Sequence, residues 1–312
     1  RLARNDYFWD KPAILKQVVF NLGRMGTGSL AQLLRNECDV MSSPISSQLQ
    51  LIEQEPSLSL NMEQAMNVSF IALNTQHYAL GNIKVRQALY YALHRQKIID
   101  SVYYGSATLA TGLLPPNSWA SQHKLPTPEY DLAKAKRLLE ESGIELPLHL
   151  TLQIQADPKA HNPSPKKTAE LIQANFAKLG IQVDVLQDRE RMRRNITADN
   201  QADMVLSGWT AATQDPDTLY RPLLSCQAYQ AGLNMSNWCN PKFDRLLNLA
   251  NQSLTRDEQQ SYYQQVSQVL RQSVPMIPIA HSLQYRVYHS SLTGFQFNPF
   301  NSGRFNQVKR VY

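Results

Sequence analysis

The sequence lacks the short motifs that mark the commonest catalytic and nucleotide-binding sites. It contains no GxGxxG, no P-loop, no HExxH and no GxSxG. These absences remove the motif-based case for dinucleotide binding, nucleotide hydrolysis, zinc proteolysis or serine hydrolysis. The seven histidines are spread singly, with no second histidine or cysteine at ligand spacing. No metal site and no cofactor is therefore expected.

Two further absences concern membranes and nucleic acids. No run of about 18 apolar residues occurs, so no part of this sequence is expected to span a membrane as a helix. The net charge is +6, but the basic residues are scattered. The densest basic cluster, RERMRRN at 189–195, has no aromatic residues on which bases could stack. It is interpreted as a solvated face, and no nucleic-acid partner is expected.

What the sequence does contain is a regular alternation of helix and strand patterns. A length of 312 residues suggests about two domains. Asp131 and Gly143 are placed to begin and end one helix, and Thr255 and Glu258 have capping-box spacing. The pattern predicts strands at 68–75, 149–155, 181–187 and 202–209, and helices at 82–105, 131–143, 167–180 and 255–273. This alternation predicts an α/β fold with a mostly parallel or mixed sheet.

Cysteine is scarce, with three in the whole chain. Cys226 and Cys239 lie thirteen positions apart across a polar loop, without the CxxC pairs that zinc sites favour. The spacing favours a disulfide over two free buried thiols, and a bridge across such a loop would stabilise the fold by about 3 kcal/mol. A disulfide would indicate an oxidising compartment. Cys38 has no obvious partner here, which is typical of a cysteine whose partner lies elsewhere.

Several long segments resemble those of one known family. They include KVRQALYYALHRQKIIDSVYYG, the LLPP–W motif, YDLAKAKRLLEESG, NPSPKKTAELIQANFAKLGIQVDV, GWTAATQDPDTLYRPLLSC and NWCNPKFDRLL. Together they span most of the chain and resemble the family 5 extracellular solute-binding proteins, the periplasmic receptors of peptide and nickel ABC importers. Three segments look closest to the branch that serves Sap peptide transport systems, which are linked to antimicrobial peptide resistance: NPSPKKTAELIQ, RPLLSC and NWCNPKFD.

The resemblance implies a two-lobe α/β periplasmic binding protein, of the type II, peptide-binding-like architecture. Residues 1–65 would form part of lobe I, 66–281 the ligand-binding lobe II, and 282–312 the return to lobe I. Ligand capture would be closure of the hinge between lobes. The family's chains are longer, so an N-terminal portion is expected to be missing. Cys226–Cys239 would be the family's local disulfide, and Cys38 would pair with a cysteine in the missing portion.

The resemblance also carries a set of ligand-binding residues onto this chain. They are Trp209, Thr210, Ala211, Ala212, Lys159, Asn162 and Glu190. Ala212 stands where dipeptide-binding relatives have an aspartate for the ligand's α-amino group. A buried ammonium without a carboxylate is unfavourable by several kcal/mol, so a free dipeptide bound in the familiar way is not expected.

Two other departures from the family pattern bear on the ligand. Lys159 stands where the family has an arginine that pairs with a carboxylate of the ligand. Lysine keeps the positive charge but cannot donate the two parallel hydrogen bonds of a guanidinium, so a carboxylate would be held less specifically. Glu190 replaces a tryptophan of the cleft and could meet a basic ligand or serve as a solvated surface residue. A longer or cationic peptide, or a bulky ligand such as haem, remains open.

The favoured hypothesis is a monomeric periplasmic receptor that delivers peptides or a similar solute to an inner-membrane ABC permease. Its alternatives are a haem-binding receptor of the same family and the ligand-sensing domain of a cytoplasmic transcription regulator. An enzyme such as a peptidase is not expected, because no nucleophile-and-base motif was found.

Overall fold

The structure of the protein is a computed structural model. It describes residues 1–21, 27–42, 44, 46–121, 128–188, 202–296, 298, 300 and 304–311. Their contacts divide the chain into two compact units. Unit 1 comprises residues 1–65 and 283–312, and unit 2 comprises residues 66–282. The assignment of the expected ranges 1–65, 66–281 and 282–312 to two lobes remains a prediction.

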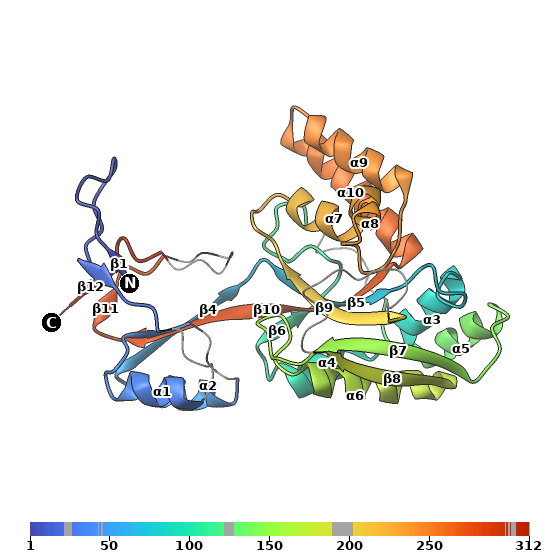
Figure 1. Cartoon of the computed structure of the whole chain (residues 1–312), viewed down its shortest axis with the longest axis horizontal. Helices are drawn as coiled ribbons and strands as arrows, with labels where there is room; N and C mark the ends of the chain where they lie inside the picture. The colour runs from blue at the N-terminus through green and yellow to red at the C-terminus, as the bar shows by residue number, and fades with distance from the viewer. Residues whose placement is uncertain are drawn as a thin grey trace. The chain divides into compact units, whose positions relative to one another are not determined.

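Unit 2 is a mixed sheet with helices packed against it. Its strands lie in the order β10-β5-β9-β7-β8, and β6 pairs with β10 (Figure 1). The strand β7 runs parallel to both β8 and β9, whereas β5 runs antiparallel to β9 and β10. The strands are β5 Asn67–Leu73, β6 Ala107–Leu109, β7 Leu148–Gln155, β8 Ile181–Asp188, β9 Met204–Thr210 and β10 Met276–His289. The mixed sheet with flanking helices is the α/β fold class that the alternation predicts.

The helices of unit 2 cover the sheet. Figure 1 shows α4, α5 and α6 on one side of β7 to β9 and α7 to α10 on the other. They are α3 Ile83–Ala92, α4 Arg95–Val102, α5 Leu132–Glu140, α6 Pro165–Phe176, the 3-10 turn η2 Ala177–Leu179, α7 Asp217–Leu224, α8 Cys226–Gln230, α9 Pro241–Gln252 and α10 Arg256–Ser273. All seven residues of β5 are buried, because helices or other strands cover both faces. The core joins the strands to α3, α4, α5 and α6.

Three predicted helix ends are confirmed. Asp131 accepts a hydrogen bond from the Lys134 backbone at the start of α5, and Gly143 follows that helix with a φ of 70°. Thr255 accepts one from the Glu258 backbone at the start of α10. At the two helix starts, a short polar side chain satisfies a backbone donor that the first helical turn leaves free. At the end of α5, glycine adopts the left-handed backbone conformation without strain.

The single helix predicted over 82–105 is wrong, because the chain forms α3 and α4 with a break between them. Leu93 is extended, with ψ at 109°, and the His94 side chain accepts a hydrogen bond from the Lys97 backbone. The His94 backbone N–H donates to the Asn175 side chain at 3.2 Å. The break is therefore fixed by a cap and by a residue of α6 that is distant in sequence.

Unit 1 has a much smaller apolar core. Its elements are β1 Leu2–Ala3, β2 Gln17–Val18, α1 Thr27–Leu34, β3 Val40–Met41, the 3-10 turn η1 Ser46–Gln48, α2 Leu49–Gln54, β4 Leu58–Gln64, β11 Leu292–Thr293, β12 Lys309–Arg310 and the end of β10. The strand β4 pairs antiparallel with β10 over residues 58–64 and 283–289. The core comprises Leu30, Leu33, Met41, Ile52, Leu58 and Val287. Within the described residues, no helix of either unit has both the length and the apolar character needed to cross a membrane.

Candidate functional site

The candidate site is built at the end of β9, where Gly208, Trp209 and Thr210 follow a buried stretch of strand. Trp209 pairs with Val68 across the antiparallel ladder, and Thr210 pairs with Asn67. Trp209 is partly buried, and its indole Nε1 is buried without a hydrogen-bond partner in the described part of the chain. A buried indole N–H normally donates to something, so this donor lacks its usual partner among the described residues.

A second segment, the loop 159–162, is tied into a small antiparallel bridge. The backbones of Lys159 and Asn162 exchange two hydrogen bonds, each 2.9 Å long. Lys159 itself is exposed, and Asn162 is 3% exposed. The Asn162 side-chain oxygen accepts from the Ser164 backbone and from the Thr168 hydroxyl, which anchors the loop to the start of α6.

The loop lies against β9 through a contact that only glycine permits. A β-carbon added to Gly208 would overlap the imidazole of His161 and would lie 2.7 Å from the carbonyl oxygen of Val68. The Tyr103 hydroxyl donates to the His161 carbonyl at 2.8 Å and holds the loop from α4's side. The structure thus brings the loop 159–162 next to the residue that precedes Trp209.

His161 contributes a neutral aromatic ring to this region. Burial, with a smaller contribution from the nearby Lys159 cation, lowers the pKa of His161 to about 4. The ring is therefore uncharged at neutral pH. Nothing in the residues around His161 marks it in the sequence as part of a site. Gly208 is the one residue whose type hints at a close contact there.

The segment after β9 offers no carboxylate where dipeptide-binding relatives would have one. Ala211 is buried and its N–H donates to the Met66 carbonyl at 2.7 Å, whereas Ala212 is exposed. A carboxylate that follows closely, that of Asp215, already accepts from the Tyr263 hydroxyl and from the Asp217 backbone. This carboxylate has its own partners within unit 2.

The predicted site residues are therefore distributed unevenly. Trp209, Thr210 and Ala211 continue one strand, and Lys159 and Asn162 lie in the loop that packs on it through His161. Glu190 lies outside the described residues, as does the whole basic cluster 189–195. In the described part of the chain, no group of three or more histidine, cysteine, aspartate or glutamate side chains gathers to hold a metal.

The disulfide between Cys226 and Cys239 is present, as the spacing favoured. It joins α8 to the segment before α9, and the Cys226 backbone N–H also donates to the Asp244 carboxylate. Cys38 is partly exposed and forms no disulfide with a described residue. Its expected pairing with a cysteine outside this sequence stays a prediction.

Comparison with known proteins identifies the family. Residues 1–231 match the model of the bacterial extracellular solute-binding proteins, family 5 Middle. The chain belongs to this family. The α/β two-lobe fold class and the periplasmic location expected from the sequence agree with that membership and are confirmed by the relatives described next.

Two curated relatives of this family 5 chain are similar over nearly its whole length. It is 39% identical over 310 residues to the "Probable ABC transporter periplasmic-binding protein SapA" of Escherichia coli. It is 38% identical over 311 residues to the "Peptide transport periplasmic protein SapA" of Salmonella typhimurium. Both alignments cover 99% of the chain but only 56% of the relative, so the chain spans little more than half the length of either.

A solved relative supports the fold directly. The crystal structure of a dipeptide-binding protein from Pseudoalteromonas sp. SM9913 in complex with Met-Leu superposes with a TM-score of 0.86 at 33% identity. The match covers 99% of the family 5 chain and 61% of that structure. The relatives are solute-binding proteins, and the family is not one of enzymes.

Proposed function

We propose that the protein is a periplasmic receptor that captures a peptide and delivers it unchanged to an inner-membrane ABC importer. Family membership and the names of the SapA relatives support this proposal. Capture would be hinged closure of two lobes by a monomer. The haem-binding and transcription-regulator alternatives are not favoured, because the two curated relatives described above carry names of periplasmic transport components.

The ligand we propose is a peptide longer than a dipeptide, with a cationic peptide as the favoured class. The observation that carries the choice of a longer peptide is the exposed Ala212, three residues after Trp209, which offers no carboxylate to an α-ammonium. A longer peptide does not depend on its terminal ammonium, because its backbone can pair with strand amides and its side chains can rest on an aromatic wall. The free indole N–H of Trp209 would donate to a peptide carbonyl.

Calorimetric titration with an arginine-containing hexapeptide, free and N-acetylated, tests this proposal. The two forms should bind within about threefold of each other, because no carboxylate is reserved for the terminal amine. The substitution Ala212→Asp should restore a preference of about tenfold for the free amine, since a charge-assisted hydrogen bond becomes available.

The matched control is Ala231→Asp, which adds the same charge at an exposed residue after α8. It should leave both affinities unchanged. A strict requirement for the free amine in the unmodified protein would contradict the proposed ligand class. Hydrolysis of the hexapeptide during the titration would contradict the proposed receptor role.

A further inference from the structure

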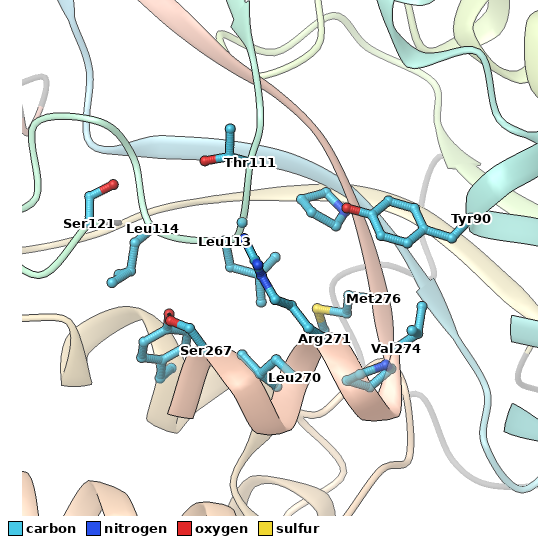
Figure 2. A pocket seen from close by; sticks show the side chains of 14 residues that line it. Tyr90, Thr111, Leu113, Leu114, Ser121, Ser267, Leu270, Arg271, Val274 and Met276 are labelled. Carbon is cyan, nitrogen blue, oxygen red and sulfur yellow. Dashed lines mark hydrogen bonds between the residues drawn. The ribbon is translucent and has the colours of Figure 1, made fainter. Parts of the chain in front are cut away.

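A cavity lies in unit 2, and its lining does not include the residues of the candidate peptide site. Its volume is about 60 Å³. Its walls come from α3, the LLPP segment (residues 113–116), the end of α10 and the start of β10. The lining residues that matter here are Tyr90, Leu113, Leu270, Arg271, Val274 and Met276 (Figure 2). Met276 pairs with Ala72 of β5, whereas Trp209 pairs with Val68. The two places are thus about 13 Å apart along β5.

The cavity is apolar apart from a few polar groups. Leu113, Val274 and Met276 are at most 5% exposed, and they present methyl and thioether groups to the space. Val274 ends α10 with a φ of 45°, which turns the chain directly into β10 beside the cavity. An apolar cavity with a small number of polar groups is the usual form of a small-molecule site.

Arg271 is the charged side chain of this cavity, and the described residues give it neither an ion pair nor a hydrogen-bond acceptor. It is partly buried in the last turn of α10. Figure 2 shows its side chain rising from the helix into the cavity. Burial raises the pKa of Tyr90 and Tyr220. The rise is opposed by Arg95 and then Arg271 at Tyr90, and by the Ser267 hydrogen bond and then Arg271 at Tyr220. Its positive charge therefore acts on the cavity walls.

The other arginines of unit 2 that are withdrawn from solvent show what Arg271 is missing. Arg95 donates to the carbonyl oxygens of Ala110, Pro278 and Pro128. Arg86 donates to three backbone carbonyls, those of Ser273, Leu80 and Gly81. Arg221 donates to the carboxylate of Asp217 at 2.8 Å. A guanidinium held away from bulk water normally has such oxygen partners.

Among the several hydroxyl groups that line the cavity is that of Tyr90. Tyr90 is 8% exposed, and its ring is fixed beneath the guanidinium of Arg95, 4.7 Å from the ring centre. Figure 2 shows the hydroxyl pointing into the cavity. A fixed phenol and a guanidinium together can hold one carboxylate through separate oxygens.

We propose that this cavity binds a small aliphatic carboxylate, with Arg271 and Tyr90 holding the carboxylate and the apolar walls holding the aliphatic group. The charge complements the arginine, and the short chain suits the volume. Because Trp209 and the loop 159–162 take no part in it, the site is independent of the proposed peptide site. A ligand without a negative charge would offer the guanidinium at most an uncharged acceptor, which binds it more weakly than a carboxylate does.

The test uses isovalerate (3-methylbutanoate) and its neutral amide as probes on the full chain. Calorimetry should detect isovalerate with a dissociation constant in the millimolar range or below, about as expected for so small a ligand, and the amide should bind at least about tenfold more weakly. Methyl NMR signals of Leu113 and Met276 should shift on titration with isovalerate. These shifts place the ligand in the cavity.

Matched variants complete the test. Arg271→Gln should weaken isovalerate binding at least about tenfold, and Tyr90→Phe several-fold. Arg245→Gln, which removes an exposed arginine from α9, should change nothing. Equal binding of acid and amide, full affinity in Arg271→Gln, or no saturable binding would each overturn the proposal. Trp209→Ala should weaken hexapeptide binding but leave isovalerate binding intact. A result that contradicts the proposed peptide site can therefore be distinguished from one that contradicts the proposed carboxylate site.

Discussion

Two regions of unit 2 each combine an aromatic side chain with a cation, but the cation is exposed to solvent in one region and partly buried in the other. Lys159 is exposed on a loop that packs beside Trp209, whereas Arg271 is partly buried in an apolar cavity beside Tyr90. An exposed cation contributes little to binding because water and salt screen it. A cation in an apolar site interacts far more strongly. The first arrangement suits long ligands of varied charge, and the second suits one small anion.

The largest expected effect comes from filling the contact that joins the loop to β9. Gly208→Val would place a β-carbon against the Val68 carbonyl oxygen and the His161 ring. Backbone cannot move aside cheaply, so we expect a loss of about 3 kcal/mol in the free energy of unfolding. Urea denaturation measures that loss. Hexapeptide affinity should fall with it, because the strand that carries Trp209 must shift.

The matched control for this glycine is Gly28→Ala. A β-carbon at Gly28 meets nothing within 4 Å, so its free energy of unfolding should change by no more than about 1 kcal/mol. If Gly208→Val proved as stable as the parent protein, the close packing of the loop on β9 would be wrong.

Acid should destabilise the protein through His161, which packs on Gly208 beside Trp209. Burial lowers the pKa of His161 to about 4, below the value of about 6.5 in an unfolded chain. As the pH falls below about 6.5, the unfolded chain takes up the proton first, so stability is lost between about pH 6.5 and 4. Since His161 is partly exposed, this loss should not exceed about 2 kcal/mol.

The variant His161→Gln isolates this contribution. It should lose less stability than the parent between pH 6.5 and pH 4 in urea denaturation, while isovalerate affinity at pH 7 stays the same. Burial also lowers the pKa of His281 to about 4, and that contribution is present in both proteins. Identical pH profiles for parent and variant would show that His161 does not titrate as described.

Much of the fold could be predicted because its signals are local. The cap at Asp131, the glycine after α5 and the buried alternation of β7 are all readable within a few residues of sequence. The break between α3 and α4 could not be predicted from the sequence, because neither Leu93 nor His94 is a residue type that breaks helices. That break depends on Asn175, which lies in another helix.

The candidate site divides along the same line. Trp209 and Lys159 were selected by resemblance to a known family, and the strand at 202–209 by its pattern. His161 can be assigned to the site only from the structure, because only the fold shows its ring packed on Gly208. From the sequence alone, Arg271 would be expected to be one more charged residue on the solvent-exposed face of a polar helix. Its isolation becomes evident only when the LLPP segment and the start of β10 close around it.

The smallest expected effect completes the comparison of the two cations. Lys159→Gln removes an exposed charge, so hexapeptide affinity should change by less than about threefold, against about tenfold for isovalerate in Arg271→Gln. Calorimetry at low and high salt checks this, since the small effect of Lys159 should disappear at about 1 M salt. A loss of tenfold or more that persists at high salt would mean that Lys159 contacts the ligand away from water. The loop 159–162 would then hold a ligand carboxylate directly, and the two regions would use their cations in the same way.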